Sequence, residues 1–171
     1  LQAIHIPEAY GGAQGDALAS AIVVEEVARA CASSSLIPGV NKLASLPVIY
    51  SGSEELKKEF LPGLAKGETL WSYALSETDA GSDAGAMKTT AVATGDSWTL
   101  NGSKKWITNA GESHIYTVLA VTDKEKGARG GITAFIVKKD DPGVSFGESE
   151  KKLGIKGSPT REVYLDNVVI P

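Results

Sequence analysis

The sequence predicts an α+β protein, in which an N-terminal α-helical segment precedes an antiparallel β-barrel or β-sandwich. Before residue 68, apolar residues recur three and four positions apart, as they do along one face of a helix. After it, short segments rich in β-branched and aromatic residues follow one another with no helical pattern between them. Turn dipeptides such as Gly95-Asp96 separate these segments, which is typical of a sheet built from hairpins.

The helical part is expected to form a partial N-terminal helical domain at residues 1–67. Its first helix should begin after Asp16, because an aspartate carboxylate can accept hydrogen bonds from the free N–H groups of the first turn. The apolar pattern then continues to Cys31. This is the only cysteine, which excludes an internal disulfide, and its alanine neighbours predict a packed structural thiol.

Two further helical segments are predicted before residue 68. A run of serines at 33–35 interrupts the pattern, and a second apolar segment begins near Pro38. Ser53, followed by two glutamates, favours the start of a third helix because acidic side chains stabilise the positive end of the helix dipole. Pro62 predicts a fresh start within that segment.

Residues 68–171 are expected to form a middle β-barrel domain. Asn101-Gly102 is among the strongest hairpin signals and should separate the third strand from the fourth. The expected strands are residues 70–75, 89–94, 97–100, 104–108, 115–121, 132–138 and 161–165.

Composition excludes several classes of function. Lys plus Arg is 17 and Asp plus Glu is 21, and the net charge of −4 argues against a nucleic-acid surface. His5 and His114 lie far apart without nearby cysteines, so no metal site is predicted. No apolar run approaches the roughly 20 residues that cross a bilayer. The cysteine usage favours the reducing cytosol or an equivalent matrix, and we expect a cytoplasmic protein.

The stretch "YALSETDAGSD" at residues 73–83 is the first candidate for a ligand site. A strand carrying Tyr73, Leu75 and Ser76 would present a fixed row of backbone groups and one hydroxyl. Gly81 and Ser82 then follow with little steric bulk, which would let the backbone approach a bulky anionic or amide-rich group. On chemistry alone, an Asx-type turn after a core strand explains this stretch equally well.

A second candidate is "KKWITNAG" at residues 104–111. Trp106 and Thr108 should share one face of a strand, with Ile107 on the other. An indole beside a hydroxyl suits a flat aromatic ligand with polar edges, although a tryptophan in a strand is usually part of the core. In the glycine-rich segment 127–131, Arg129 at the tip of a flexible hairpin could reach a phosphate.

Together these stretches resemble the acyl-CoA dehydrogenase family. "YALSETDAGSD", "LNGSKKWITNAG" and residues 131–171 follow the order and spacing of that family, and "IPEAYGG" and "GSEELKKEFLPGLAKGE" resemble its N-terminal helical region. The similarity covers essentially the whole chain and is closest to bacterial members of the short- and branched-chain type. It implies a flavoprotein with FAD that forms a trans-2 double bond in an acyl-CoA, with hydride transfer to flavin N5. It also implies reoxidation by an electron-transfer flavoprotein, and a homodimer or homotetramer when full length.

The resemblance further implies roles for individual residues. The strand from Tyr73 to Ser76 would lie along the isoalloxazine ring. The backbone near Leu75 and Ser76 would meet the polar edge of that ring, and the Ser76 hydroxyl would lie near the N5 side. Gly81 and Ser82 would belong to the same cofactor-binding stretch, and Ser82 would also contact the CoA portion of the substrate.

The second stretch and the loop would complete the site. Trp106 would pack on the flavin face away from the substrate, and Ile107 and Thr108 would bind the cofactor through backbone or hydroxyl groups. Arg129 is the remaining candidate for substrate binding. The family usually has proline at the position of Thr78, and threonine at that of Ser76, where the hydroxyl is kept and one methyl group is lost.

Members of this family are much longer than 171 residues, so we expect the chain to be a fragment that lacks a C-terminal helical domain. In most members that domain carries the catalytic carboxylate, and no acid here matches it, so no catalytic residue is predicted. The fragment alone should be inactive. Two alternatives stay open: an acyl-CoA oxidase, in which reduced flavin meets oxygen directly, and a flavin- or CoA-binding fragment without turnover.

Overall fold

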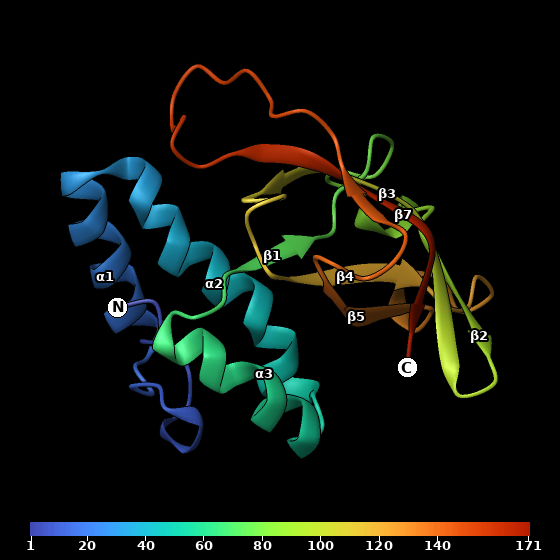
Figure 1. Cartoon of the computed structure of the whole chain (residues 1–171), viewed down its shortest axis with the longest axis horizontal. Helices are drawn as coiled ribbons and strands as arrows, with labels where there is room; N and C mark the ends of the chain where they lie inside the picture. Colours follow the sequence, from blue (N-terminus) through green and yellow to red (C-terminus); the bar gives the residue numbers. More distant parts are fainter. The chain divides into compact units, whose positions relative to one another are not determined.

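The first part of the chain is helical in the computed structural model, which describes residues 1–171 (Figure 1). A short 3-10 helix, η1, precedes three α-helices. Asp16 caps α1, since its carboxylate accepts a hydrogen bond from the N–H of Ala19 at 2.8 Å. Ser53 caps α3 in the same way, and Gly67 ends it with a left-handed φ of 78°. The helices are η1 (Glu8–Tyr10), α1 (Ala17–Ala30), α2 (Ala32–Ser51) and α3 (Glu54–Lys66).

Two of the predicted helix breaks are wrong. The serine run and Pro38 both lie inside α2, and Pro62 lies inside α3. A proline within a helix removes one N–H donor and disfavours the helical geometry. In α2 the buried positions nevertheless recur at helical spacing, so burial of one face outweighs this local cost. These buried residues are Ser35, Pro38, Asn41, Ala44, Ser45 and Val48.

The second part of the chain forms a curled sheet of seven strands in the order β1-β4-β2-β3-β7-β6, with β5 paired to β4. The prediction of an antiparallel barrel or sandwich is only partly right, because the sheet is mixed. The connection from β3 to β4 crosses β2, so β4 lies beside β2 and runs in the same direction. The two strands pair in parallel through Thr90 and Val121. The strands are β1 (Trp71–Ala74), β2 (Thr90–Thr94), β3 (Ser97–Thr108), β4 (Ile115–Val121), β5 (Ile132–Lys138), β6 (Val144–Phe146) and β7 (Thr160–Ile170).

The predicted Asn101-Gly102 turn is also wrong, because both residues lie within the continuous strand β3. Two irregularities in the pairing of β3 with β7 explain the turn-like sequence. Between Leu100 and Gly102 the extra residue is on β7, and between Lys104 and Ile107 it is on β3. The two β-bulges offset each other, so the strands stay paired over their length.

The structure divides the chain into two compact units, which are the helical unit (Leu1–Ser72 with Lys151–Ser158) and the sheet unit (Tyr73–Glu150 with Pro159–Pro171). Within the helical unit, the Gly157 N–H donates to the Ser33 hydroxyl at 3.2 Å. The core of the sheet unit includes Leu100, Tyr116 and Val163, each fully buried. None of the helices is both long enough and apolar enough to cross a membrane.

Candidate functional site

The structure brings the two candidate stretches side by side within the sheet unit. The N–H of Lys105, on β3, donates to the carbonyl of Ser76 at 2.8 Å. Ser76 lies just beyond the end of β1, and its side chain is half-buried, as are those of Tyr73 and Leu75. Its own N–H and hydroxyl have no partner within the chain. Two hydrogen-bond donors are therefore available at the end of β1.

Trp106 is not part of the core. Its side chain is 59% exposed, whereas Ile107 next to it is 2% exposed. The β3 bulge explains this difference, because the extra residue lets both Lys104 and Ile107 face inward while Trp106 faces out. Trp106 has a left-handed φ of 57°, a conformation that bulky side chains rarely adopt. A large exposed aromatic side chain on a strained backbone thus follows directly after Lys105, the residue that pairs with Ser76.

The end of β3 is held in place by its neighbours. Lys105 Nζ lies 5.5 Å from the centroid of the Trp106 ring and 3.6 Å from a carboxylate oxygen of Glu162. In the loop that follows Thr108, the Gly111 N–H donates to the buried Tyr116 hydroxyl at 2.8 Å. Burial raises the pKa of Tyr116 to about 12, so this hydroxyl stays protonated under ordinary conditions.

The acidic run after β1 serves the fold more than a ligand. The Glu77 carboxylate is buried and lies 2.7 Å from Nζ of Lys104, whose side chain is fully buried. Asp79 forms an exposed ion pair with Lys88 at 2.7 Å. Asp83 accepts from the N–H of Gly85 at 3.1 Å, which is the Asx-type turn considered from the sequence. The Asx-type turn considered from the sequence is therefore present in this stretch.

Glu77 and Lys104 are residues that the sequence-based reasoning missed. The available signal was strand alternation, because Lys104 is four residues after the buried Leu100 and so falls on the inward face of β3. Burial favours neutral Glu77, but hydrogen bonds from Lys104, Thr89 and the Lys88 N–H outweigh it and lower the pKa of Glu77 below its usual value. Burial lowers the pKa of Lys104, against the attraction of Glu77.

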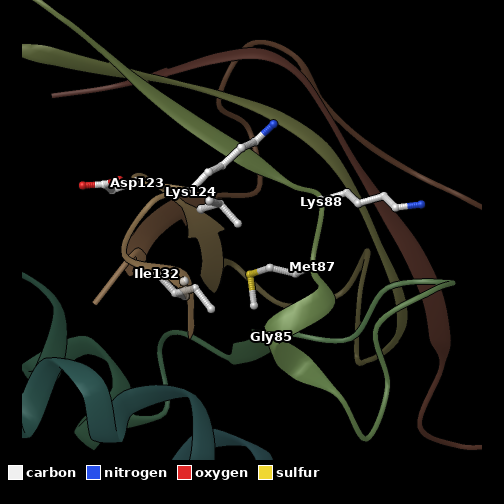
Figure 2. Close-up of a pocket in the computed structure, with 8 residues that line it drawn as sticks. Gly85, Met87, Lys88, Asp123, Lys124 and Ile132 are labelled. Carbon is white, nitrogen blue, oxygen red and sulfur yellow. The ribbon is translucent and has the colours of Figure 1, made fainter. Parts of the chain in front are cut away.

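A second region of interest surrounds a pocket of about 210 Å³ (Figure 2). Figure 2 shows Met87 and Ile132 together at this pocket, while the amino group of Lys88 points away from it. Two short 3-10 helices, η2 (Ala84–Ala86) and η3 (Gly127–Arg129), meet here. A Cβ atom added to Gly85 would lie 3.1 Å from that of Ala128.

The predicted substrate-binding residues flank this pocket without lining it. Gly81 and Ser82 are exposed in the loop before η2, and Arg129 is exposed at the end of η3. The segment connects the antiparallel strands β4 and β5, so it is the predicted hairpin tip, and it contains the short helix η3. Cys31 is exposed between α1 and α2, so its prediction as a packed thiol is wrong, because the helix ends just before it.

A helical unit followed by a curled mixed sheet, with an exposed tryptophan on the strand segment that pairs with Ser76, is the architecture to compare with known protein families. Residues 1–68 match the acyl-CoA dehydrogenase N-terminal domain, and residues 72–168 match the acyl-CoA dehydrogenase middle domain. The chain belongs to the acyl-CoA dehydrogenase family.

Individual relatives agree with this assignment. A probable acyl-CoA dehydrogenase of Mycobacterium leprae is 62% identical over the whole chain, which covers 44% of that protein. Butyryl-CoA dehydrogenase from Megasphaera elsdenii has a TM-score of 0.93 at 39% identity, over 99% of this chain and 45% of the other. An acyl-CoA dehydrogenase from Bacillus anthracis, solved in complex with FAD, has a TM-score of 0.89 at 40% identity, over 99% of this chain and 29% of the other. The chain thus spans less than half the length of these relatives.

Proposed function

We propose that the chain forms the flavin-facing part of an FAD-dependent acyl-CoA dehydrogenase, which converts an acyl-CoA thioester to the trans-2-enoyl-CoA. The observation that carries this proposal is the hydrogen bond between Lys105 and Ser76, which pairs the residue with two free donors with the strand segment that carries the exposed indole of Trp106. Flat heteroaromatic rings with polar edges need both elements, because the face requires an apolar surface and the edge requires hydrogen bonds. The residues present therefore fit an isoalloxazine ring.

Each residue has a proposed role. The N–H of Ser76 donates to the polar edge of the ring, which favours negative charge at that edge, and the Ser76 hydroxyl lies near the N5 side. Trp106 covers the ring face away from the substrate and excludes water from it. Ile107 is buried and anchors the strand, so that its backbone and Thr108 are presented to the cofactor. FAD, when bound, accepts the hydride that leaves the β-carbon of the acyl group.

Substrate contacts are proposed for the loops near the second region. Ser82 offers a hydroxyl group with little steric hindrance, and Arg129 offers a guanidinium group suited to a phosphate of CoA, while Gly81 and Ser82 also belong to the proposed cofactor-binding stretch. Tyr73 and Leu75 contribute the half-buried wall that leads to Ser76. No acid of this chain is proposed as the base that removes the α-proton.

The proposed partners follow from the same assignment. A chain in the structure of an electron transferring flavoprotein of Acidaminococcus fermentans has a TM-score of 0.95 at 38% identity, over 99% of this chain and 45% of the other. We take this likeness as support for an electron-transfer flavoprotein as the acceptor of the electrons. A homodimer or homotetramer and a cytoplasmic location complete the proposal.

The test uses the full-length enzyme that carries this segment. An acyl-CoA is added anaerobically, and the visible absorbance of the flavin is followed. Bleaching that is reversed rapidly by electron-transfer flavoprotein and slowly by air supports a dehydrogenase. Rapid reversal by air would instead establish an oxidase. A yellow protein that no acyl-CoA of any chain length bleaches would contradict both and favour a binding fragment without turnover.

A further inference from the structure

The buried ion pair between Lys104 and Glu77 lies directly behind the proposed flavin edge. Lys104 Nζ is 2.7 Å from Glu77 Oε1 and also donates to the carbonyl oxygen of Leu75 at 3.1 Å. The lysine side chain is fully buried and the glutamate is 6% exposed. Buried charges are costly unless they are paired and hydrogen-bonded, and a hydrophobic pair often stabilises a fold equally well. Stability alone therefore does not account for a lysine at this position.

The glutamate fixes the geometry of the lysine. Glu77 Oε2 accepts from the N–H of Lys88 at 2.6 Å, and Oε1 accepts from the N–H of Thr89 at 3.0 Å. Both donors belong to the backbone just before β2, which is part of the sheet. The carboxylate thus has three donors around it and cannot turn away from Lys104 without losing them. The ammonium group is held at one point, against the carbonyl of Leu75.

That contact sets the direction of the Ser76 N–H. In a planar trans peptide, the C=O of one residue and the N–H of the next point in opposite directions. With the Leu75 carbonyl turned to Lys104, the Ser76 N–H points away from the ion pair. The carbonyl of Ser76 is itself held by the Lys105 N–H at 2.8 Å, so the peptide units on both sides of Ser76 are fixed. A carbonyl bonded to a cation also polarises its peptide, which makes the N–H a stronger donor.

We infer that Lys104, held by Glu77, is a positioning residue that orients and polarises the Leu75–Ser76 peptide so that its N–H favours the reduced, anionic flavin over the oxidised form. This inference rests on the proposed function. It assigns to a buried pair, outside direct contact with the cofactor, part of the control over the reduction potential.

The test measures the flavin reduction potential of the full-length holoenzyme by dithionite titration. The variant Lys104→Met/Glu77→Gln removes both charges at similar side-chain volume. The ratio of affinities for reduced and oxidised flavin is expected to fall about threefold to tenfold, which makes the two-electron potential ~15–30 mV more negative. The matched control, Lys57→Met/Glu54→Gln, removes the 3.3 Å surface ion pair of α3 and should leave the potential unchanged.

A folded neutral variant that retains flavin at the wild-type potential would overturn the inference. If the neutral variant does not fold, Lys104→Gln decides, because it removes the cation but keeps an amide donor next to Glu77 and the Leu75 carbonyl. A more negative potential in Lys104→Gln supports the role, and a wild-type potential contradicts it. Dithionite reduces the flavin without any acyl-CoA, so the two proposals can fail separately. An enzyme that acyl-CoA does not reduce would contradict the proposed function, and the measured flavin reduction potentials would still test the role of Lys104.

Discussion

At position 106, the residue that would best stabilise the fold differs from the residue that a ligand site would require. The left-handed φ of 57° costs about 1–2 kcal/mol for a residue with a Cβ atom, and the 59% exposed indole returns little packing energy. Glycine would suit the backbone better at this position. The presence of tryptophan is therefore explained by what the side chain is proposed to bind.

Replacing Trp106 should separate these two contributions. In the 171-residue chain, Trp106→Gly is expected to leave the free energy of unfolding unchanged or raise it by up to about 1 kcal/mol. In the full-length enzyme the same change should weaken FAD binding by about tenfold or more, because an apolar ring contact is lost, and slow turnover. Urea denaturation and FAD titration measure the two effects.

Trp98 provides the control for that experiment. Its ring packs edge-on against Phe135 at 5.5 Å between centroids, next to the core of the sheet unit. Trp98→Gly should therefore destabilise the chain by about 3–5 kcal/mol. A comparable loss of stability in Trp106→Gly would show that Trp106 belongs to the core after all.

His5 should make stability dependent on pH between pH 6.5 and 4. Burial, followed by the nearby charge of Lys42, lowers the pKa of His5 to about 4, and its Nε2 lies 2.8 Å from the Ser45 hydroxyl. Between these pH values the unfolded chain binds more protons than the folded one. Stability is thus complete above about pH 6.5 and falls as the pH drops towards 4.

The variant His5→Asn removes this titration while keeping a polar side chain. Its free energy of unfolding, measured in urea at several pH values, should vary less between pH 6.5 and 5 than that of the wild type. The window above pH 5 is informative because the lowered pKa of Glu77 adds its own loss of stability only below pH 4.5. An identical slope in both proteins would contradict this assignment.

Among the elements, those governed by local pattern were predicted best. The bounds of β4 and β5 agree with the predicted segments, and Gly95-Asp96 forms the turn between β2 and β3, where Thr94 pairs with Ser97. The wrong predictions concern residues whose conformation depends on partners that are distant in the sequence. Asn101 looks like a turn residue, but its side chain accepts from the N–H of Asn167 on β7 at 2.8 Å, and the bulges accommodate it within a strand.

Replacing one glycine of β3 and one glycine of α2 by alanine compares a crowded position in the sheet with an open position on a helix. Gly102 in β3 has a φ of 150°, and a Cβ there would lie 2.5 Å from the Thr89 hydroxyl and 2.7 Å from its Cα. Gly102→Ala should lower the free energy of unfolding by about 1–3 kcal/mol. Gly39 lies in α2 with no atom within 4 Å of an added Cβ, so Gly39→Ala should raise it by about 0.5–1 kcal/mol. Thermal or urea denaturation of both variants decides; equal effects would contradict the close contact at Gly102.

The candidate site shows a similar limit of sequence-based prediction. The motifs predicted that the stretches around Ser76 and Trp106 matter, and the structure places them side by side. The pairing of Lys104 with Glu77 could not be predicted from spacing, because it depends on how the loop after β1 folds back over β3. Burial of both charges is a property of the tertiary structure.

At the scale of the whole molecule, the site is one-sided. The residues proposed to meet FAD come from the end of β1 and the end of β3, all within the sheet unit. A tightly bound cofactor is usually buried over about 70–90% of its surface, which a single wall cannot provide. The chain also spans only 44% of its Mycobacterium leprae relative.

The 171-residue chain alone should therefore hold little FAD. After incubation with excess FAD and desalting, its visible flavin absorbance should correspond to well under one cofactor per chain. The full-length enzyme, treated in the same way, should retain about one. A stoichiometric amount of flavin on the short chain would mean that the wall formed by the sheet unit is sufficient by itself.

The three tryptophans also give the protein a built-in optical readout. Trp71 is fully buried in the helical unit, Trp98 is half-buried in the sheet unit, and Trp106 is the exposed one. Emission from Trp106 should be shifted to longer wavelength and quenched by soluble iodide, while that of Trp71 should resist the quencher. Flavin bound against the indole would quench the same component, so the residue proposed to hold the ring would also report, by its fluorescence, when the ring arrives.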